Sequence, residues 1–304
     1  LNNVSGTTLT GTYTVGSGDT TPDLAVTAIT SANVSDNNSH TRTAYDLPSS
    51  QGSFTAENSF ITRNIGDSKN IKIGSYESIT TGSNPYQISV PINGYLYVAN
   101  QGAGTVSVIR ISDNTLTDTI TVGDEPYGLT YSNSQLYVAN TGSDTVSVID
   151  PSDNTVTDTI AVGVRPYYAE KIGNTVYVTN GASNTVSVIN TTSNTVTDTI
   201  AVGSYPRGIK AHGTDLYVAN YGDPNYSGGN YISVIDSLTN EVTDTIILPG
   251  GSDGPRGVTV LDSKVYVTNF RSNNVSVINT ATNTITNTIE VGTGPRGIIG
   301  LGTN

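Results

Sequence analysis

Hydrophobic and polar residues follow a repeating pattern along most of this chain. In the repeat spanning residues 126–163, four short runs rich in β-branched and aromatic residues alternate with polar segments. The runs are Gly128–Ser132, Leu136–Asn140, Val146–Asp150 and Val156–Val162. Clusters of Ser, Asn, Asp, Pro and Gly between them favour tight turns, and no helical period occurs. The pattern predicts four short antiparallel strands per repeat.

Three signatures mark the repeats. A Tyr-Val-Ala/Thr-Asn segment begins at Tyr97, Tyr137, Tyr177, Tyr217 and Tyr266, with spacings of 40, 40, 40 and 49 residues. A Val-Ser-Val-Ile segment or a close variant follows, and a Thr-rich run comes next. A proline opens each unit, at Pro85, Pro126, Pro166, Pro206, Pro255 and Pro295. Four strands in about forty residues, repeated in register, are typical of a β-propeller blade.

Each run has the character that its place in a blade requires. Val146–Ile149 is apolar on both faces, which predicts a middle strand packed between neighbouring blades. The run from Thr155 to Ile160 alternates with Thr, which predicts an outer strand half in water. Its acid, Asp158, shares a face with Val156 and Ile160 and recurs as Asp118, Asp198 and Asp244. We expect these carboxylates to bond to an adjacent backbone or hydroxyl group. Metal binding is the alternative, although each repeat offers only one acid.

The signatures resemble the YVTN repeat of archaeal and bacterial surface-layer proteins. Tyr-Val-Ala-Asn and Tyr-Val-Thr-Asn, followed by Val-Ser-Val-Ile, carry the resemblance over residues 85–304. It implies a seven-bladed propeller displayed outside the cell. Some relatives lie beside redox cofactors, and one branch consists of lactonases, so the fold alone does not assign chemistry.

The blade count depends on both ends of the sequence. Pro295–Gly300 matches only the first strand of a blade, and residues 8–16 match only the last. We therefore expect residues 1–16 to complete a composite terminal blade, which removes an open sheet edge. Residues 17–84 are expected to form a divergent blade with a long insertion, at about Ser31–Glu57. Its expected strands are Pro22–Val26, Ser59–Asn64, Asn70–Ile73 and Tyr76–Gly82. With five regular repeats at 85–304, the total is seven.

Two alternatives stay open at this stage. The composite blade can form between molecules, with Leu1–Gly16 pairing to the open edge of a neighbouring copy. Strand addition of this kind produces filaments or lattices. Residues 17–80 can also form a separate small β-domain.

Composition limits the possible binding partners of the protein and its location in the cell. The net charge is −12, the pI is near 4.3 and charged residues make up only 12%. Such a surface repels nucleic acid, and no apolar run is long enough to span a membrane. The sequence contains no Met and no Cys, and its first residue, Leu1, indicates removal of a signal peptide. Six Asn-x-Ser/Thr sequons are glycosylation candidates, at Asn3, Asn33, Asn37, Asn190, Asn225 and Asn274.

Catalytic motifs are absent from the sequence. The only histidines, His40 and His212, are too few for a zinc centre and are expected to be exposed. Glu170 is expected to form a salt bridge with Lys210 across the channel. We therefore predict no enzymatic activity, no cofactor and no metal site.

One set of residues suggests binding. The residues directly after the blade-opening prolines are Tyr86, Tyr127, Tyr167, Arg207, Arg256 and Arg296. They are expected to ring one mouth of the central channel, where they can hold an anionic group or a sugar. Bonds to carbonyl groups of the neighbouring blade are the alternative, and Arg165 can add to either role. Enlarged loops at 221–231 and 249–254 are a second candidate surface.

These observations predict a non-enzymatic structural protein of the cell surface that assembles with itself as a surface layer, sheath or filament. The alternative is an extracellular adhesion module that recognises a glycan or a partner protein of the cell envelope.

Overall fold

The structure is a computed structural model that describes residues 33–35, 41–43, 61–63, 70–73, 77–89, 91–222, 230–250 and 253–300, with side chains from residue 79 onward. None of these residues lies in a helix, so no described helix could cross a membrane. The chain divides into two compact units, 1–61 with 74–76 and 62–73 with 77–304. In the first unit, β1 (Asn33–Ser35) and β2 (Thr41–Thr43) pair antiparallel.

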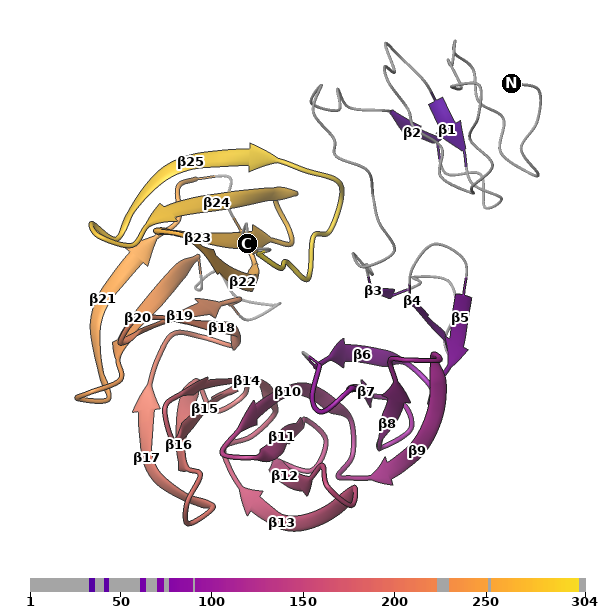
Figure 1. Cartoon of the computed structure of the whole chain (residues 1–304). Coiled ribbons are helices and arrows are strands. Elements are labelled where there is room, and N and C mark those ends of the chain that lie inside the picture. The colour runs from indigo at the N-terminus through magenta and orange to yellow at the C-terminus, as the bar shows by residue number, and fades with distance from the viewer. Residues whose placement is uncertain are drawn as a thin grey trace. The chain divides into compact units, whose positions relative to one another are not determined.

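The second unit contains five four-stranded antiparallel sheets in which consecutive strands are neighbours. Their first strands lie innermost (Figure 1) and are β6 (Pro85–Ile88), β10 (Pro126–Ser132), β14 (Pro166–Ile172), β18 (Pro206–His212) and β22 (Pro255–Leu261). The second strands are β7 (Tyr95–Asn100), β11 (Gln135–Asn140), β15 (Thr175–Asn180), β19 (Asp215–Asn220) and β23 (Lys264–Asn269). This arrangement confirms the expected succession of blade-like sheets.

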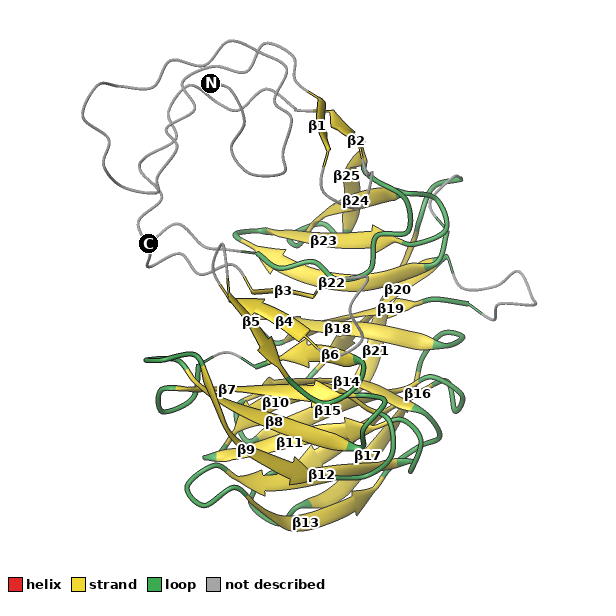
Figure 2. Ribbon diagram, turned by 90° about the vertical axis from the view of Figure 1, so that its right-hand side faces the viewer, coloured by secondary structure: helices red, strands yellow, loops and turns green. Residues whose placement is uncertain are grey.

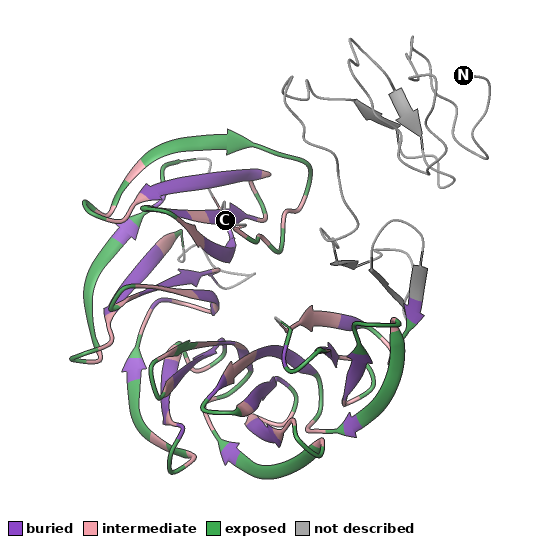
Figure 3. Ribbon diagram, in the orientation of Figure 1, coloured by how far each residue is buried: buried purple, intermediate pink, exposed green. Residues whose placement is uncertain are grey.

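The remaining strands differ sharply in burial. The third strands are β8 (Thr105–Arg110), β12 (Thr145–Asp150), β16 (Thr185–Asn190), β20 (Tyr231–Asp236) and β24 (Asn274–Asn279). The fourth strands are β9 (Thr115–Thr121), β13 (Thr155–Ala161), β17 (Thr195–Ala201), β21 (Glu241–Ile247) and β25 (Thr284–Glu290). Third strands are buried along their length, whereas fourth strands are almost wholly exposed (Figure 3). Both results match the predicted middle and outer positions.

A three-stranded sheet precedes the five. It consists of β3 (Ile61–Arg63), β4 (Asn70–Ile73) and β5 (Glu77–Thr80), and β5 lies beside β9 as β9 lies beside β13. These strands fall within three of the four expected for the divergent blade. The fourth, Pro22–Val26, and the segment Leu1–Gly16 lie outside the described residues. Within the expected insertion, the structure describes only β1 and β2.

The sheets have propeller-like architecture, and the described strands do not close into a ring. Figure 2 shows them in profile, with turns at both ends of the strands. Hydrophobic clusters fill the space between neighbouring sheets; one joins Val106 and Ile120 to Leu129 and Leu136 of the next sheet. The core therefore lies between the sheets, where burial of apolar side chains stabilises their packing.

The signature tyrosine also joins neighbouring sheets. Tyr97 is 1% exposed, and its hydroxyl donates to Asn154 Oδ1 (3.2 Å) in the β12–β13 turn. Asn154 Nδ2 donates in turn to Asp118 Oδ2 (3.0 Å), while Asp118 Oδ1 accepts from the backbone N–H of Thr119 (2.7 Å). The expected bond from the recurring acid to adjacent backbone is thus confirmed. The sequence did not predict the second partner of Asp118, which is the side-chain amide of Asn154 in the next sheet.

The fourth strand departs from regular alternation at one residue. In β13, Asp158 is opposite Val148 and Val156 is opposite Ile149, so Thr157 is the extra residue of a bulge. Its hydroxyl donates to the Val148 carbonyl (3.3 Å). The expectation that Asp158 shares a face with both Val156 and Ile160 was therefore right for Ile160 and wrong for Val156. Val156 is 38% exposed, whereas Ile160 is 6% exposed.

The link between sheets depends on a glycine. A Cβ atom on Gly163 would lie 2.7–2.8 Å from the side chain of Asn180, the last residue of the signature in the following sheet. Two residues later, Arg165 has a φ of 56°, which places the chain for Pro166. Gly82, Gly123 and Gly203 make the same approach to the equivalent asparagines. These positions therefore require glycine, because the next sheet packs directly against the backbone there.

The segment Pro295–Gly300 is docked like the first strand of another sheet. Thr268 Oγ1 donates to the Arg296 carbonyl (3.0 Å), as Thr179 Oγ1 donates to the Arg207 carbonyl (2.7 Å). A Cβ on Gly257 would lie 2.4 Å from the Arg296 carbonyl oxygen, matching the approach of Gly208 to Arg256. The expected match to a first strand is thus supported by contacts, although no described strand pairs with this segment.

Two glycines show what this docked segment lacks. Gly292 corresponds to Gly163, and Gly297 corresponds to Gly257. No described atom lies within 4 Å of a Cβ built on either residue. The place that the next sheet would fill is therefore open among the described residues.

Candidate functional site

The predicted tyrosines and arginines come together because each occupies the same place in its strand. Tyr86, Tyr127, Tyr167, Arg207 and Arg256 are the second residues of β6, β10, β14, β18 and β22. These innermost strands surround a common centre (Figure 1), and hydrogen bonds and a cation–π contact join their second residues there. The prediction that they cluster is confirmed for these five. Arg296, in the docked segment, is exposed.

Tyr127 lies at the middle of the cluster. Its hydroxyl is hydrogen-bonded to the hydroxyl of Tyr86. Arg256 Nη2 donates to both hydroxyl oxygens, at 2.7 Å each, and Arg207 Nη1 reaches Tyr127 Oη at 3.3 Å. Two guanidinium groups from different sheets therefore share one phenol oxygen.

Aromatic rings surround the two arginines. The Arg207 Cζ atom lies 3.9 Å from the ring centroid of Tyr167, close enough for a cation–π interaction. The Tyr127 ring meets those of Tyr167 and Tyr168 edge-on, at centroid distances of 5.0 and 5.3 Å. These contacts fill the centre with phenol and guanidinium groups.

Further arginines and aromatic residues lie around this cluster. Arg165 Nη1 donates to Tyr205 Oη (2.9 Å), and that hydroxyl is hydrogen-bonded to Tyr167 Oη (3.2 Å). Arg271 stacks on Tyr221 at 4.5 Å. Arg256 and Arg296 approach Phe270 at 5.4 and 5.3 Å. Five of the eight arginines of the sequence, Arg165, Arg207, Arg256, Arg271 and Arg296, thus belong to this region.

Sequence reasoning missed four aromatic residues of this site. Tyr168 stands where the equivalent strands have Gly128, Gly208 and Gly257, while Tyr205 directly precedes a blade-opening proline. Tyr221 and Phe270 directly follow the signature asparagine. The signal was available, because aromatic residues stand at repeat positions where most other repeats have non-aromatic residues. The alternative, bonding to carbonyl groups of the neighbouring blade, does not describe Arg207 and Arg256, whose guanidinium groups donate to phenol oxygens.

The centre of the cluster carries positive charge that no described carboxylate balances. Ion pairs among the described residues join Arg110 to Asp113, Lys210 to Glu170 and Arg271 to Asp253. None involves Arg207 or Arg256, although Arg256 is only 7% exposed. This region is therefore electropositive within a protein of net charge −12.

The tyrosine pKa values respond to this field. Burial alone would raise the pKa of Tyr86, but the Arg256 charge and hydrogen bonds from Tyr127, Tyr168 and Arg256 lower it below its usual value. Burial raises the pKa of Tyr127 to about 12 despite both arginines. The two phenols share Arg256, yet their pKa values shift in opposite directions. Negative charge is thus favoured on the Tyr86 side of the pair.

The other candidate residues have simpler environments. Lys210 Nζ lies 2.8 Å from Glu170 Oε1, which confirms the expected salt bridge, but the pair joins the neighbouring strands β14 and β18 rather than crossing the channel. His212 is half-buried rather than exposed, since it ends β18 within a paired sheet. No group of three or more His, Asp or Glu residues in the described ranges could hold a metal ion. His40 lies outside those ranges.

The sequons divide into three groups. Asn274 is 5% exposed and accepts a hydrogen bond from Asn269 Nδ2 (2.7 Å), so burial argues against a glycan there. Asn190 is half-buried at the end of β16. The side chains of Asn3, Asn33, Asn37 and Asn225 lie outside the described part of the structure.

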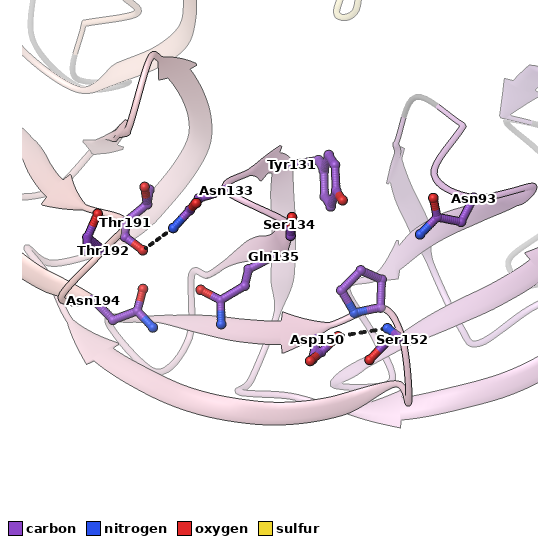
Figure 4. Close-up of a pocket in the computed structure, with 11 residues that line it drawn as sticks. Asn93, Tyr131, Asn133, Ser134, Gln135, Asp150, Ser152, Thr191, Thr192 and Asn194 are labelled. Atoms are coloured by element: carbon purple, nitrogen blue, oxygen red, sulfur yellow. Dashed lines mark hydrogen bonds between the residues drawn. The ribbon is translucent and has the colours of Figure 1, made fainter.

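A polar depression lies near the end of the innermost strand β10, whereas the arginine cluster lies at the start of the innermost strands. It has a volume of about 700 Å³ and is lined by turns that include Asn133, Gln135, Asp150 and Thr191 (Figure 4). Asn133 Nδ2 donates to the Thr191 carbonyl (3.0 Å), which joins two sheets across it. Its amides and hydroxyls suit a turn surface, and the arginine cluster is elsewhere. Of the enlarged loops, residues 223–229 and 251–252 are not described.

Comparison with known proteins supports the architecture alone. No protein-family model matches the chain, and no curated protein matches its sequence. Its structure is similar to that of Kuenenia stuttgartiensis hydrazine synthase, a propeller-like β protein, with a TM-score of 0.52 and 16% identity. The similarity covers 71% of this chain and 89% of the other. The shared feature is therefore a propeller-like all-β fold.

Proposed function

We propose that this protein is a non-enzymatic structural protein of the cell exterior whose copies assemble through their incomplete blades. The observation that carries the proposal is the docked segment Pro295–Gly300. It makes the contacts of a first strand, while no described atom lies within 4 Å of a Cβ built on Gly292 or Gly297. A first strand without a sheet is a site for strand addition, since its backbone groups bond readily to an incoming strand.

A head-to-tail contact of this kind repeats from copy to copy. Because the two joined surfaces differ, the contact is heterologous and produces a filament unless it closes into a ring. Leu1–Gly16, in which residues 8–16 match the last strand of a blade, is the segment that we propose fills the site from a neighbouring copy. A seven-bladed count, with one composite blade, is part of this proposal.

The proposed location rests on sequence character. The repeat signature resembles that of surface-layer proteins, and Thr fills the exposed fourth strands. Labelling intact native cells with a membrane-impermeant reagent tests this part. Labelling only after lysis would contradict it.

Assembly is tested by blocking the open position without disturbing the fold. Gly292→Leu places a large side chain where no described atom lies within 4 Å, so the isolated chain should fold normally. We expect wild-type protein to form polymers by light scattering and electron microscopy, and the variant to stay monomeric. Gly250→Leu, which likewise meets no described atom within 4 Å, is the matched control. Wild-type protein that is monomeric at every concentration would refute the proposal.

A second candidate function is ligand binding at the aromatic and arginine region. Arg165, Arg271 and Arg296 are exposed around a buried arginine, an arrangement suited to an acidic glycan. Replacing these three by Gln should abolish binding to an acidic glycan array and leave the denaturation midpoint nearly unchanged. Equal binding by wild type and variant would exclude this surface.

A further inference from the structure

We propose that Arg207 and Arg256 form a site for one oxyanion group, a carboxylate, phosphate or sulfate. The inference rests on the second candidate function and specifies its ligand chemistry. It is independent of whether the protein assembles.

The first argument is the missing counter-charge. Arg256 is 93% buried, since only 7% of its surface is exposed, and no described carboxylate pairs with it or with Arg207. Buried charges in proteins are usually paired, because an isolated charge loses its hydration without compensation. An anion between the two guanidinium groups supplies the missing partner.

The second argument is the number of unused donors. The Nε atoms of both Arg207 and Arg256 are buried and have no hydrogen-bond partner among the residues that the structure describes. At the same time, Nη atoms of both residues converge on Tyr127 Oη. A guanidinium group offers five N–H donors in a planar fork that suits two oxygen atoms of one oxyanion. The cluster therefore has both the charge and the donors that such a group requires.

The pKa of Tyr86 responds to the positive charge of Arg256. The lowered pKa of Tyr86 shows that negative charge is stabilised beside Arg256, despite burial. Tyr86 ionisation is thus the competing way to balance the arginines. It requires no ligand and predicts a different result in the test below.

The exposed arginines suggest how the group is presented. Arg207 is half-buried, while Arg165 and Arg296 are exposed near the cluster. A free oxyanion would use the inner pair alone. An oxyanion carried on a glycan would also use the outer residues, so the two sources are distinguishable.

The test compares anions in thermal unfolding and calorimetry at constant ionic strength and pH 7. The probes are sulfate, inorganic phosphate and acetate, with chloride as reference. We expect the three oxyanions to raise the unfolding temperature above its value in chloride, because a ligand that binds only the folded state stabilises it. Arg207→Gln and Arg256→Gln should each weaken binding at least ten-fold. Arg110→Gln, which removes an arginine paired with Asp113, should not.

A second readout separates binding from a structural role. In chloride, Arg256→Gln should leave the unfolding temperature unchanged or raise it, because it removes an unpaired buried charge. If that variant does not fold, Arg207→Gln, at a half-buried position, keeps the test decisive. A large loss of stability in Arg207→Gln, together with equal anion effects in all variants, would overturn the proposal.

Tyrosinate absorbance at 295 nm tests the competing explanation. One ionised tyrosine at pH 8 that disappears in Tyr86→Phe, with no anion effect, would show that the charge is balanced internally and would overturn the proposal. To identify the source, sulfated oligosaccharide is compared with free sulfate. Tighter binding of the oligosaccharide that requires Arg165 and Arg296 supports a glycan, whereas equal binding supports a free oxyanion at the same site.

Discussion

At the residue scale, the signature tyrosine acts between sheets as well as within its own strand. Tyr137 is fully buried, and its hydroxyl donates to Asn194 Oδ1 (2.8 Å) in the turn of the following sheet. The same contact joins Tyr97 to Asn154, Tyr177 to Asn240 and Tyr217 to Asn283. The tyrosine is therefore a point of attachment between successive repeats.

Replacing Tyr137 with Phe tests this attachment. We expect the free energy of unfolding to fall by about 1 kcal/mol, the usual net contribution of such a hydrogen bond. Urea denaturation measures the change. In a double-mutant cycle with Asn194→Gly, which keeps the φ of 52° accessible, the two substitutions should be coupled. Additive effects would show that the hydroxyl does not join the sheets.

The residue types predicted the strands but not the hydrogen bonds between residues of different sheets. The recurring Asp118 was expected to bond locally, and its bond to Thr119 N–H is local. Its bond to Asn154 crosses 36 residues, and only the spacing between sheets determines it. The pairing of Arg256 with Tyr86 spans 170 residues and follows from convergence of the innermost strands.

At the element scale, the glycine between successive sheets sets how closely they approach. Gly163→Ala would place a methyl group 2.7–2.8 Å from Asn180. We expect a loss of about 1–3 kcal/mol in unfolding free energy, typical of overpacking. The matched control is Gly292→Ala, measured on unassembled protein, which meets no described atom within 4 Å. Equal losses in both variants would mean that general glycine effects, not the contact, explain the result.

Strand order and burial were predictable because the repeat shows its pattern five times. The bulge in β13 was not, since Thr157 looks like an ordinary member of an alternating strand. Its hydroxyl bond to Val148 recurs as Thr117 to Val108 and Thr197 to Val188. A bulge increases local twist, which alternation alone does not reveal.

At the scale of the whole molecule, repeated burial of tyrosine predicts sensitivity to alkaline pH. Burial raises the pKa of Tyr97, Tyr127, Tyr137 and Tyr217 to about 12. Between pH 10 and 12 the unfolded chain loses these protons first, so stability that is present below pH 10 falls as the pH rises. Each group contributes at most about 3 kcal/mol.

The urea midpoint measured at pH 8, 9.5 and 11 checks this expectation. Tyr86, whose pKa is lowered, acts in the opposite direction and adds stability as the pH approaches 10. We therefore expect little change up to pH 9.5 and a clear fall at pH 11. A midpoint at pH 11 equal to that at pH 8 would contradict the burial of these phenols.

The central claim concerns how copies join, and a mixing experiment tests it most directly. Light scattering is measured on the full chain, on a chain lacking residues 1–16, on a chain lacking residues 295–304, and on an equal mixture of the two shortened chains. If strand addition joins copies, the full chain forms polymers and each shortened chain is monomeric. The mixture stops at dimers, because each pair retains one complete junction. A monomeric full chain, or polymers from either shortened chain alone, would contradict the account.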